Sequence, residues 1–221
     1  MKRDTKHASE HAPWSNVLLL VLLVGSIFIS PYLPVDWGWE NGAVENAQVL
    51  VLLLGMATAI WGAQFHGFPV RRLWVVASLF WLAMAGRELA WGAAFWPESG
   101  FSPESGPIIT SRILWYRPAV PWILALMLAW VVYAVLRYRL ISRVVWPWCR
   151  QRLVPWTTLA LFVLAMLVSA HAEGHALLGL PVPPEQTAMV LEEVAEFWAY
   201  VALFWAQWQL VMLPRDEGTP A

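Results

Sequence analysis

The chain has 221 residues, of which 59% are hydrophobic and only 13% charged, and its mean hydropathy is +0.55. This composition is too apolar for an ordinary soluble domain and predicts an integral membrane protein. A formal net charge of -1 without a basic patch argues against a nucleic-acid partner. The single cysteine, Cys149, excludes a disulfide or a cysteine-based metal site within one chain.

Six apolar runs are each long enough, at roughly 20 residues, to cross a bilayer as a helix. All 16 prolines lie outside these runs or at their edges, as expected where lipid cannot satisfy a broken backbone ladder. We therefore predict an all-α fold in one domain, an integral membrane bundle of six transmembrane helices over 16–213, with tails at 1–15 and 214–221. The predicted helices cover, in chain order, 16–33, 43–64, 72–96, 119–138, 155–179 and 188–213.

The basic residues predict the orientation, because Lys and Arg near helix ends stay on the cytoplasmic side. They lie before the first run, between runs two and three, between runs four and five, and after run six, whereas the opposite connectors are mostly acidic. We predict that both termini are cytoplasmic and that the protein is a multi-pass protein of the cell inner (plasma) membrane. Membrane lipids are the expected partners, and protein partners are left open.

Ionisable residues gather at one depth, in the outer halves of four predicted helices. At about 1.5 Å per residue, Arg87 and Glu88 lie about 12 to 14 Å below the outer end of run three. Because a charged group facing lipid is costly, these residues are predicted to point into the bundle and to find partners there. The set comprises Glu45, Gln48, Arg87, Glu88, His171, Glu173, His175, Glu192, Glu193 and Glu196.

Helical phase divides this set further, because residues four apart share a face of a helix. His171 and His175 are predicted to share one face, and Glu192 and Glu196 another. Glu173 lies about 200° from His171 around the helix and is predicted to point elsewhere.

A metal site is one prediction from this pattern. Arg87 is the only cation at this depth and cannot neutralise all the carboxylates, so the surplus must be protonated, solvated or neutralised by a bound cation. Imidazole and carboxylate ligands together suit a divalent Zn, Fe or Mn ion. Glu88 or Glu192 would then act as a general base on metal-bound water, and Arg87 would hold an anionic group. The predicted metal ligands are His171, His175, Glu196, Glu45 and Glu193.

Each part of the pattern also has a purely structural interpretation. The histidines are compatible with a solvated position at the membrane interface. The Arg87–Glu88 pair is compatible with an ion pair that locks two helices together. The glutamates that open the last run suit a helix start, where the helix dipole favours negative charge.

Three segments, "WENGAVENAQVLVLLLG", "AGRELAWG" and "LEEVAEFWAYVAL", resemble a set of bacterial multi-pass membrane proteins. The shared pattern is an acidic pair that opens one helix, Gly-x-Glu-x-x-Trp-Gly in the next, and Glu-Glu-x-x-Glu at the start of the last. The resemblance covers about half of the chain and implies architecture only. The histidine pair also resembles alkaline-ceramidase-like membrane hydrolases, in which His and Asp hold a zinc and a Ser assists. Ser169 is nearby here, but a third intramembrane His and an intramembrane Asp are absent from the sequence.

Three functions follow as hypotheses. The first is a metal-dependent membrane enzyme that acts on a lipid or another amphiphile. The second is a proton-coupled transporter or channel in which the His and Glu residues relay protons, although the polar residues stop in the outer half. The third is a non-catalytic assembly subunit in which the cluster fixes helix packing.

Overall fold

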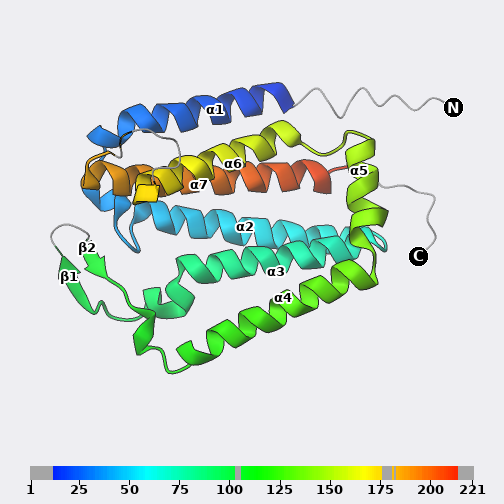
Figure 1. The fold of residues 1–221 in the computed structure, drawn as a ribbon, viewed down its shortest axis with the longest axis horizontal. Coiled ribbons are helices and arrows are strands. Elements are labelled where there is room, and N and C mark those ends of the chain that lie inside the picture. The colour runs from blue at the N-terminus through cyan, green and yellow to red at the C-terminus, as the bar shows by residue number, and fades with distance from the viewer. Residues whose placement is uncertain (1–11, 103–105, 176–180, 182, 214–221) are drawn as a thin grey trace.

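The long helices lie side by side along one axis, and one short helix crosses an end of the bundle (Figure 1). The computed structural model describes residues 12–102, 106–175, 181 and 183–213. The long helices are α1 (Ala12–Ile29), α2 (Ala43–Phe65), α3 (Val70–Glu88), α4 (Val120–Arg137), α6 (Trp156–Ala170) and α7 (Glu185–Val211).

The two ends of the bundle are distinct. At one end β1 (Gly100–Ser102) and β2 (Gly106–Ile108) form a small antiparallel hairpin, in which Phe101 pairs with Pro107. At the other end α5 (Trp146–Arg150) crosses the helices (Figure 1). We call these the hairpin end and the α5 end. The start of α1, the first described helix, and the end of α7, the last, both lie at the α5 end.

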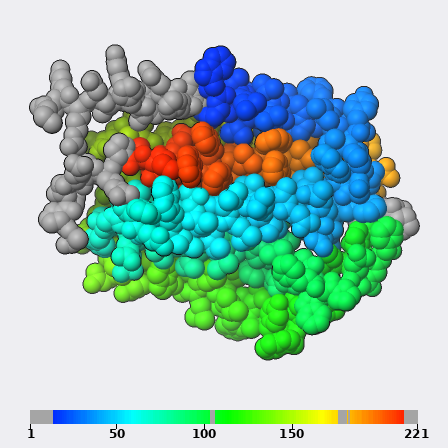
Figure 2. Space-filling view, turned by 180° about the vertical axis from the view of Figure 1, so that it is seen from behind, coloured from blue at the N-terminus to red at the C-terminus, as the bar shows by residue number. Residues whose placement is uncertain are grey.

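The centre of the bundle is α7, which packs against α1, α2 and α6. Alanines in this core, among them Ala165 of α6 with Ala195 and Ala199 of α7, let the helix backbones approach closely. A second apolar cluster joins α2, α3 and α7 around Trp81 of α3. Seen from behind, α2 and α7 lie in front and side by side (Figure 2), so α3 and α6 cover their other face.

The outermost helix, α4, packs mainly on α3 and exposes large apolar side chains. Trp122 is 74% exposed and Leu126 is 71% exposed. An apolar face of this size suits a lipid environment better than water. Four helical segments of the described residues are long and apolar enough to cross a membrane: Trp14–Tyr32, Ala43–Phe65, Arg117–Arg137 and Trp156–His175.

Two predicted helices end earlier than the sequence indicated. The third was expected to reach residue 96, but α3 ends at Glu88, because Trp91 and Gly92 adopt positive φ angles of 59° and 101°. A 3-10 segment, Ala90–Phe95, follows. Arg87 and Glu88 therefore lie in the last turn of α3 rather than well below its end.

The fifth predicted helix, over 155–179, is regular only to the end of α6 at Ala170. A π-helical turn, His171–His175, follows, and Gly174 within it has a φ of 101°. The remainder of the predicted run lies outside the described residues. The hairpin and α5 were not predicted.

Candidate functional site

An ion pair joins the hairpin end of α3 to α7. The Nη2 atom of Arg87 lies 2.8 Å from Glu196 Oε2 and 3.0 Å from Glu88 Oε1. Arg87 Nε also donates a hydrogen bond to the same oxygen of Glu88. The side chains of Glu88 and Glu196 are 7% and 11% exposed, whereas that of Arg87 is 58% exposed. The guanidinium therefore pairs with two nearly buried carboxylates and still presents a free edge.

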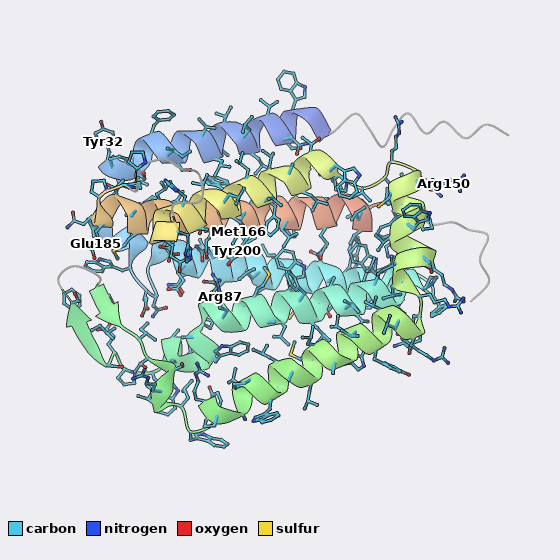
Figure 3. The ribbon with its side chains drawn as sticks, viewed as in Figure 1. Tyr32, Arg87, Arg150, Met166, Glu185 and Tyr200 are labelled. Atoms are coloured by element: carbon cyan, nitrogen blue, oxygen red, sulfur yellow. The ribbon has the colours of Figure 1, made fainter. Side chains whose placement is uncertain are left out.

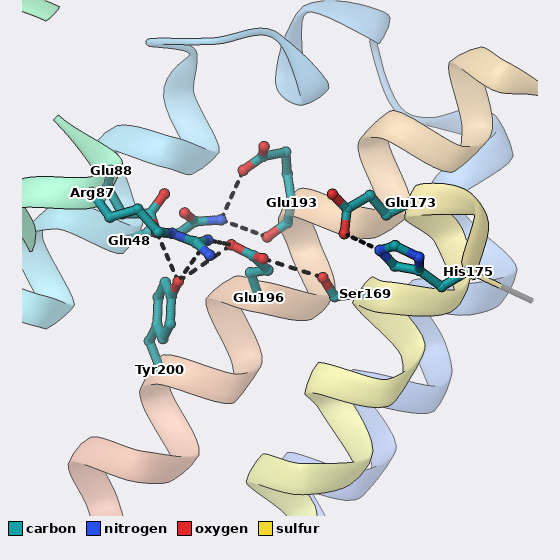
Figure 4. Close-up of polar contacts among 9 residues, drawn as sticks. All are labelled: Gln48, Arg87, Glu88, Ser169, Glu173, His175, Glu193, Glu196 and Tyr200. Atoms are coloured by element: carbon teal, nitrogen blue, oxygen red, sulfur yellow. Dashed lines mark hydrogen bonds and ion pairs between the residues drawn. The ribbon is translucent and has the colours of Figure 1, made fainter. Parts of the chain in front are cut away.

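Tyr200 and Ser169 complete this network (Figure 4). The hydroxyl of Tyr200 donates to Glu88 Oε1 at 2.8 Å and lies 3.3 Å from Glu196 Oε2. Ser169, on α6, donates to the other oxygen of Glu196 at 3.3 Å. Glu196 consequently contacts α3 and α6 from its position on α7, and it ties three helices together at one level.

The N-terminal part of α2 contributes polar groups at the same level. Gln48 is fully buried, and its Nε2 donates to the backbone carbonyl and to Oε2 of Glu193, both at 2.8 Å. Glu45 accepts a hydrogen bond from the backbone N–H of Asn41. Its carboxylate is close enough to Glu88 for the two charges to interact. The carboxylates of α2, α3 and α7 thus crowd one region, which we call the polar cluster.

Besides the buried Oε1 of Gln48, which has no partner among the described residues, two partly exposed groups of the polar cluster keep unused hydrogen-bonding capacity. Glu192 makes no hydrogen bond or ion pair with the rest of the described chain, although its charge interacts with those of Glu173, Glu196 and Arg87. The Nη1 atom of Arg87 likewise has no acceptor among the described residues. A free carboxylate and a free pair of N–H donors therefore lie near each other.

The two histidines are separated, which corrects the expectation that they share a face. His171 is buried, with 5% exposure, and its Nδ1 has no partner among the described residues. The side chain of His175 is 62% exposed and pairs with Glu173, at 3.3 Å between Nε2 and Oε2. The π-helical turn explains the difference, because its i→i+5 hydrogen bonds break the four-residue repeat on which the expectation rested. Glu173, which was expected to point elsewhere, is the residue that contacts His175.

His171 also lies away from Glu196. Residues two apart on a helix point about 200° from each other, and Ser169 occupies the α6 position that faces Glu196. In residues 12–102, 106–175, 181 and 183–213, no group of three or more His, Cys, Asp or Glu is placed to hold a metal ion. Of the five ligands predicted from the sequence, Glu45, Glu193 and Glu196 gather in the polar cluster, but the structure does not bring the two histidines together with them. Metal binding stays a prediction.

An apolar cavity of about 200 Å³ lies toward the α5 end from the polar cluster. It is open along one side and lies between α3 and α6, over α7, with Trp148 of α5 at its end. Its lining is almost wholly apolar, with Gln207 the single polar residue. The lining residues are Leu73, Trp74, Ala77, Phe80, Trp81, Trp148, Leu159, Leu203, Ala206, Gln207 and Leu210.

The cavity and the polar cluster share a face of α7 and a face of α3. On α7, Glu196, Leu203 and Leu210 follow at seven-residue intervals, which keeps them on one face. On α3, Phe80 and Arg87 are related in the same way. Figure 3 labels Arg87 of α3 and Tyr200 of α7, which belong to the polar cluster. We call the cavity and the polar cluster together the groove, with a polar part at the hairpin end and an apolar part toward the α5 end.

Tyr200 is a residue of the polar cluster that was not predicted from the sequence. A tyrosine in the middle of an apolar helix looks like a packing residue by itself. Its spacing carried the missing signal, because it lies one turn after Glu196 and so shares its face.

No family model matches the chain, and no curated protein or solved structure is detectably similar to it.

Proposed function

We propose that this protein binds a lipid or another amphiphile, with the polar head at the polar cluster and the apolar part in the groove between α3 and α6. The observation that carries the proposal is the alignment of the polar cluster and the apolar cavity along the same faces of α3 and α7. A half-exposed guanidinium beside an open apolar cavity suits a ligand that is polar at one end only. A ligand held in this way lies parallel to the helices.

The proposal includes six membrane-spanning helices. At about 1.5 Å per residue, α7 is about 40 Å long and exceeds the hydrocarbon core of about 30 Å, whereas α3, at about 28 Å, spans nearly all of it. Both lie within the bundle, and 73–86 and 197–213 carry no charged residue. Basic residues concentrate at the α5 end, which we place on the cytoplasmic side of an inner membrane, with both termini. These are Arg71, Arg72, Arg137, Arg139, Arg143, Arg150 and Arg152.

A proton relay through the bundle has less support. Between the polar cluster and the α5 end, the buried polar side chains that the structure describes, among them Trp74, Trp81 and Gln207, are neutral. Trp81 Nε1 donates to Gln207 Oε1 at 2.5 Å, and Gln207 Nε2 donates to the carbonyl of Gly55 at 2.8 Å. Metal-dependent chemistry on the bound amphiphile, with Glu88 or Glu192 as general base, remains a prediction. It has less support than binding alone, because the histidines that would hold the metal lie apart.

Binding is tested with the full chain in detergent, by native mass spectrometry across a titration of phospholipid. We expect saturable binding to the wild type. Leu159→Trp, which enlarges a side chain that lines the cavity, should weaken binding at least tenfold. Leu164→Trp is the matched control, because Leu164 is on the opposite side of α6 and is already exposed. Absence of saturable binding by the wild type, or equal affinity of the two variants, would contradict the proposal.

The topology is tested separately with reporter fusions. A fusion at Ala221 and one within 98–106 should report opposite sides of the membrane. An alkaline phosphatase that is active at Ala221 would contradict the proposed orientation.

A further inference from the structure

We infer that the amphiphile is a zwitterionic phospholipid whose head carries a primary ammonium, with its phosphate at Arg87 and its ammonium at Glu192. This inference rests on the proposed function, because it names the ligand class of the same groove. Its basis is the pair of unused groups at the polar end of the groove.

Arg87 supplies the phosphate-binding group. Its Nε and Nη2 are engaged by Glu88, Glu196 and Tyr200, while the two N–H bonds of Nη1 have no acceptor in the described part of the chain. A guanidinium edge next to lipid must find an oxygen, because an unsatisfied donor in hydrocarbon costs several kcal/mol. Phosphate is a good acceptor for arginine, since the charge-assisted hydrogen bond is about twice as strong as a neutral one.

Glu192 supplies the ammonium-binding group. It is half-buried, it has no partner in the described residues, and its charge interacts with that of Arg87. Glu173, which is exposed and lies near Glu192, adds a second carboxylate at the mouth of the groove. A primary ammonium would satisfy Glu192 and would offset the negative charge that Glu173 and Glu196 contribute there.

The balance of charge discriminates among lipid heads. One guanidinium faces the carboxylates of Glu45, Glu88, Glu192, Glu193 and Glu196, so the polar cluster carries surplus negative charge when these are ionised. A purely anionic head would bind Arg87 but would leave Glu192 without a partner. A choline head is cationic but has no N–H to donate to a carboxylate. Only a head with both a phosphate and a primary ammonium uses both free groups.

The length of the groove suits an acyl chain attached to that head. Phe80 and Leu73 lie one and two heptads from Arg87 along α3, which is about 10 Å and 21 Å at 1.5 Å per residue. One leaflet of the hydrocarbon core is about 15 Å thick, half of the whole. The near part of the cavity, at Phe80, therefore lies within the depth of one leaflet from a head at Arg87, and its far end at Leu73 lies about 6 Å beyond that depth. Phe80, which is 56% exposed, stands on the open side of the groove.

The test compares three phospholipids that have identical oleoyl chains and ethanolamine, choline or glycerol heads. Binding to the full chain in detergent is measured by native mass spectrometry. We expect the ethanolamine lipid to bind at least tenfold more tightly than either of the other two lipids. A factor of about ten corresponds to the loss of one hydrogen bond to a charged group. Glu192→Gln should lower affinity for the ethanolamine lipid to that for the choline lipid and leave the latter unchanged. Glu185→Gln, a control at the exposed start of α7, should change neither affinity.

The outcomes separate the two proposals. If no phospholipid binds saturably, the proposed function and this inference both fail. If all three bind alike, or if Glu192→Gln preserves the preference, while Leu159→Trp still weakens binding, the proposed function stands and this inference fails. Soluble glycerophosphoethanolamine tests whether the head alone is the ligand. If this soluble compound displaces the ethanolamine lipid at an equal concentration, the acyl chain contributes nothing to binding, and the assignment to a membrane lipid is overturned.

Discussion

Removal of the Arg87 charge should destabilise the protein mainly by leaving two buried carboxylates without a counter-charge. In Arg87→Gln the side chains of Glu88 and Glu196 stay nearly buried, but both lose the guanidinium that lies 3.0 Å and 2.8 Å from them. At an effective dielectric constant of about 20, each contact at this distance corresponds to about 5 kcal/mol of attraction before desolvation is subtracted. Breaking a buried ion pair costs about 3 to 5 kcal/mol, and an exposed pair contributes about 0 to 1. Because Arg87 is half-exposed, we expect a loss of about 2 to 3 kcal/mol.

The assay is reversible unfolding of the purified protein in mixed detergent and dodecyl sulfate. Arg87→Gln should be destabilised, while Arg71→Gln, a control at the exposed start of α3, should change stability by less than about 0.5 kcal/mol. In the double variant Arg87→Gln/Glu196→Gln, one uncompensated carboxylate is removed. The combined loss should therefore fall short of the sum of the single losses by about 1 to 2 kcal/mol. Additive losses would refute the ion pair as the link between α3 and α7.

Four further outcomes are expected. Gly55→Ala should lower the free energy of unfolding by about 1 to 3 kcal/mol, because the new Cβ would lie 2.5 Å from the ring of Trp81. Gly25→Ala is the matched control in α1. Its Cβ would have no atom within 4 Å, so it should raise the free energy of unfolding by about 0.5 to 1 kcal/mol in the same assay. Tyr200→Phe should cost about 1 kcal/mol, because a buried carboxylate loses a donor, and an unchanged unfolding midpoint would contradict this. His171→Ala should lower stability by about 1 to 3 kcal/mol, and His175→Ala by less than about 0.5, because only the first is buried. If the metal site predicted from the sequence forms, elemental analysis will find stoichiometric Zn, Fe or Mn in the wild type and a loss in His171→Ala; a metal-free wild type after metal-replete expression would contradict it.

The long helices could be predicted from the sequence because the apolar runs and the prolines both mark them. The predicted run over 43–64 corresponds to α2 at Ala43–Phe65, and the run over 119–138 corresponds to α4 at Val120–Arg137. The early end of α3 could not be predicted in the same way. Ala90 and Trp91 are ordinary helix residues by composition, and their positive φ angles are set by tertiary contacts. One such contact is the hydrogen bond from the hydroxyl of Tyr116 to the carbonyl of Trp91.

The candidate site, like the fold, could be predicted from the sequence only in part. Arg87, Glu88 and Glu196 were identified because charged residues in apolar helices must find partners, and they contact each other. The histidine pair rested on helical phase, which holds only while the α-helical repeat continues. The π-helical turn after α6 changes that repeat, and Ser169, in the regular part of α6, is the residue that contacts Glu196. The apolar groove depends on the space between α3 and α6, which no pattern within a single helix reveals.

The central claim is that the groove between α3 and α6 holds an amphiphile with its head at Arg87. The most direct test is a density map of the full chain purified from native membranes into lipid nanodiscs. We expect elongated density in the groove, with a head group within hydrogen-bonding distance of Arg87 Nη1 and a chain that extends past Phe80 toward Leu73. A groove closed by direct contact between α3 and α6, or one without ordered lipid density in a map that resolves the lining side chains, would contradict the claim.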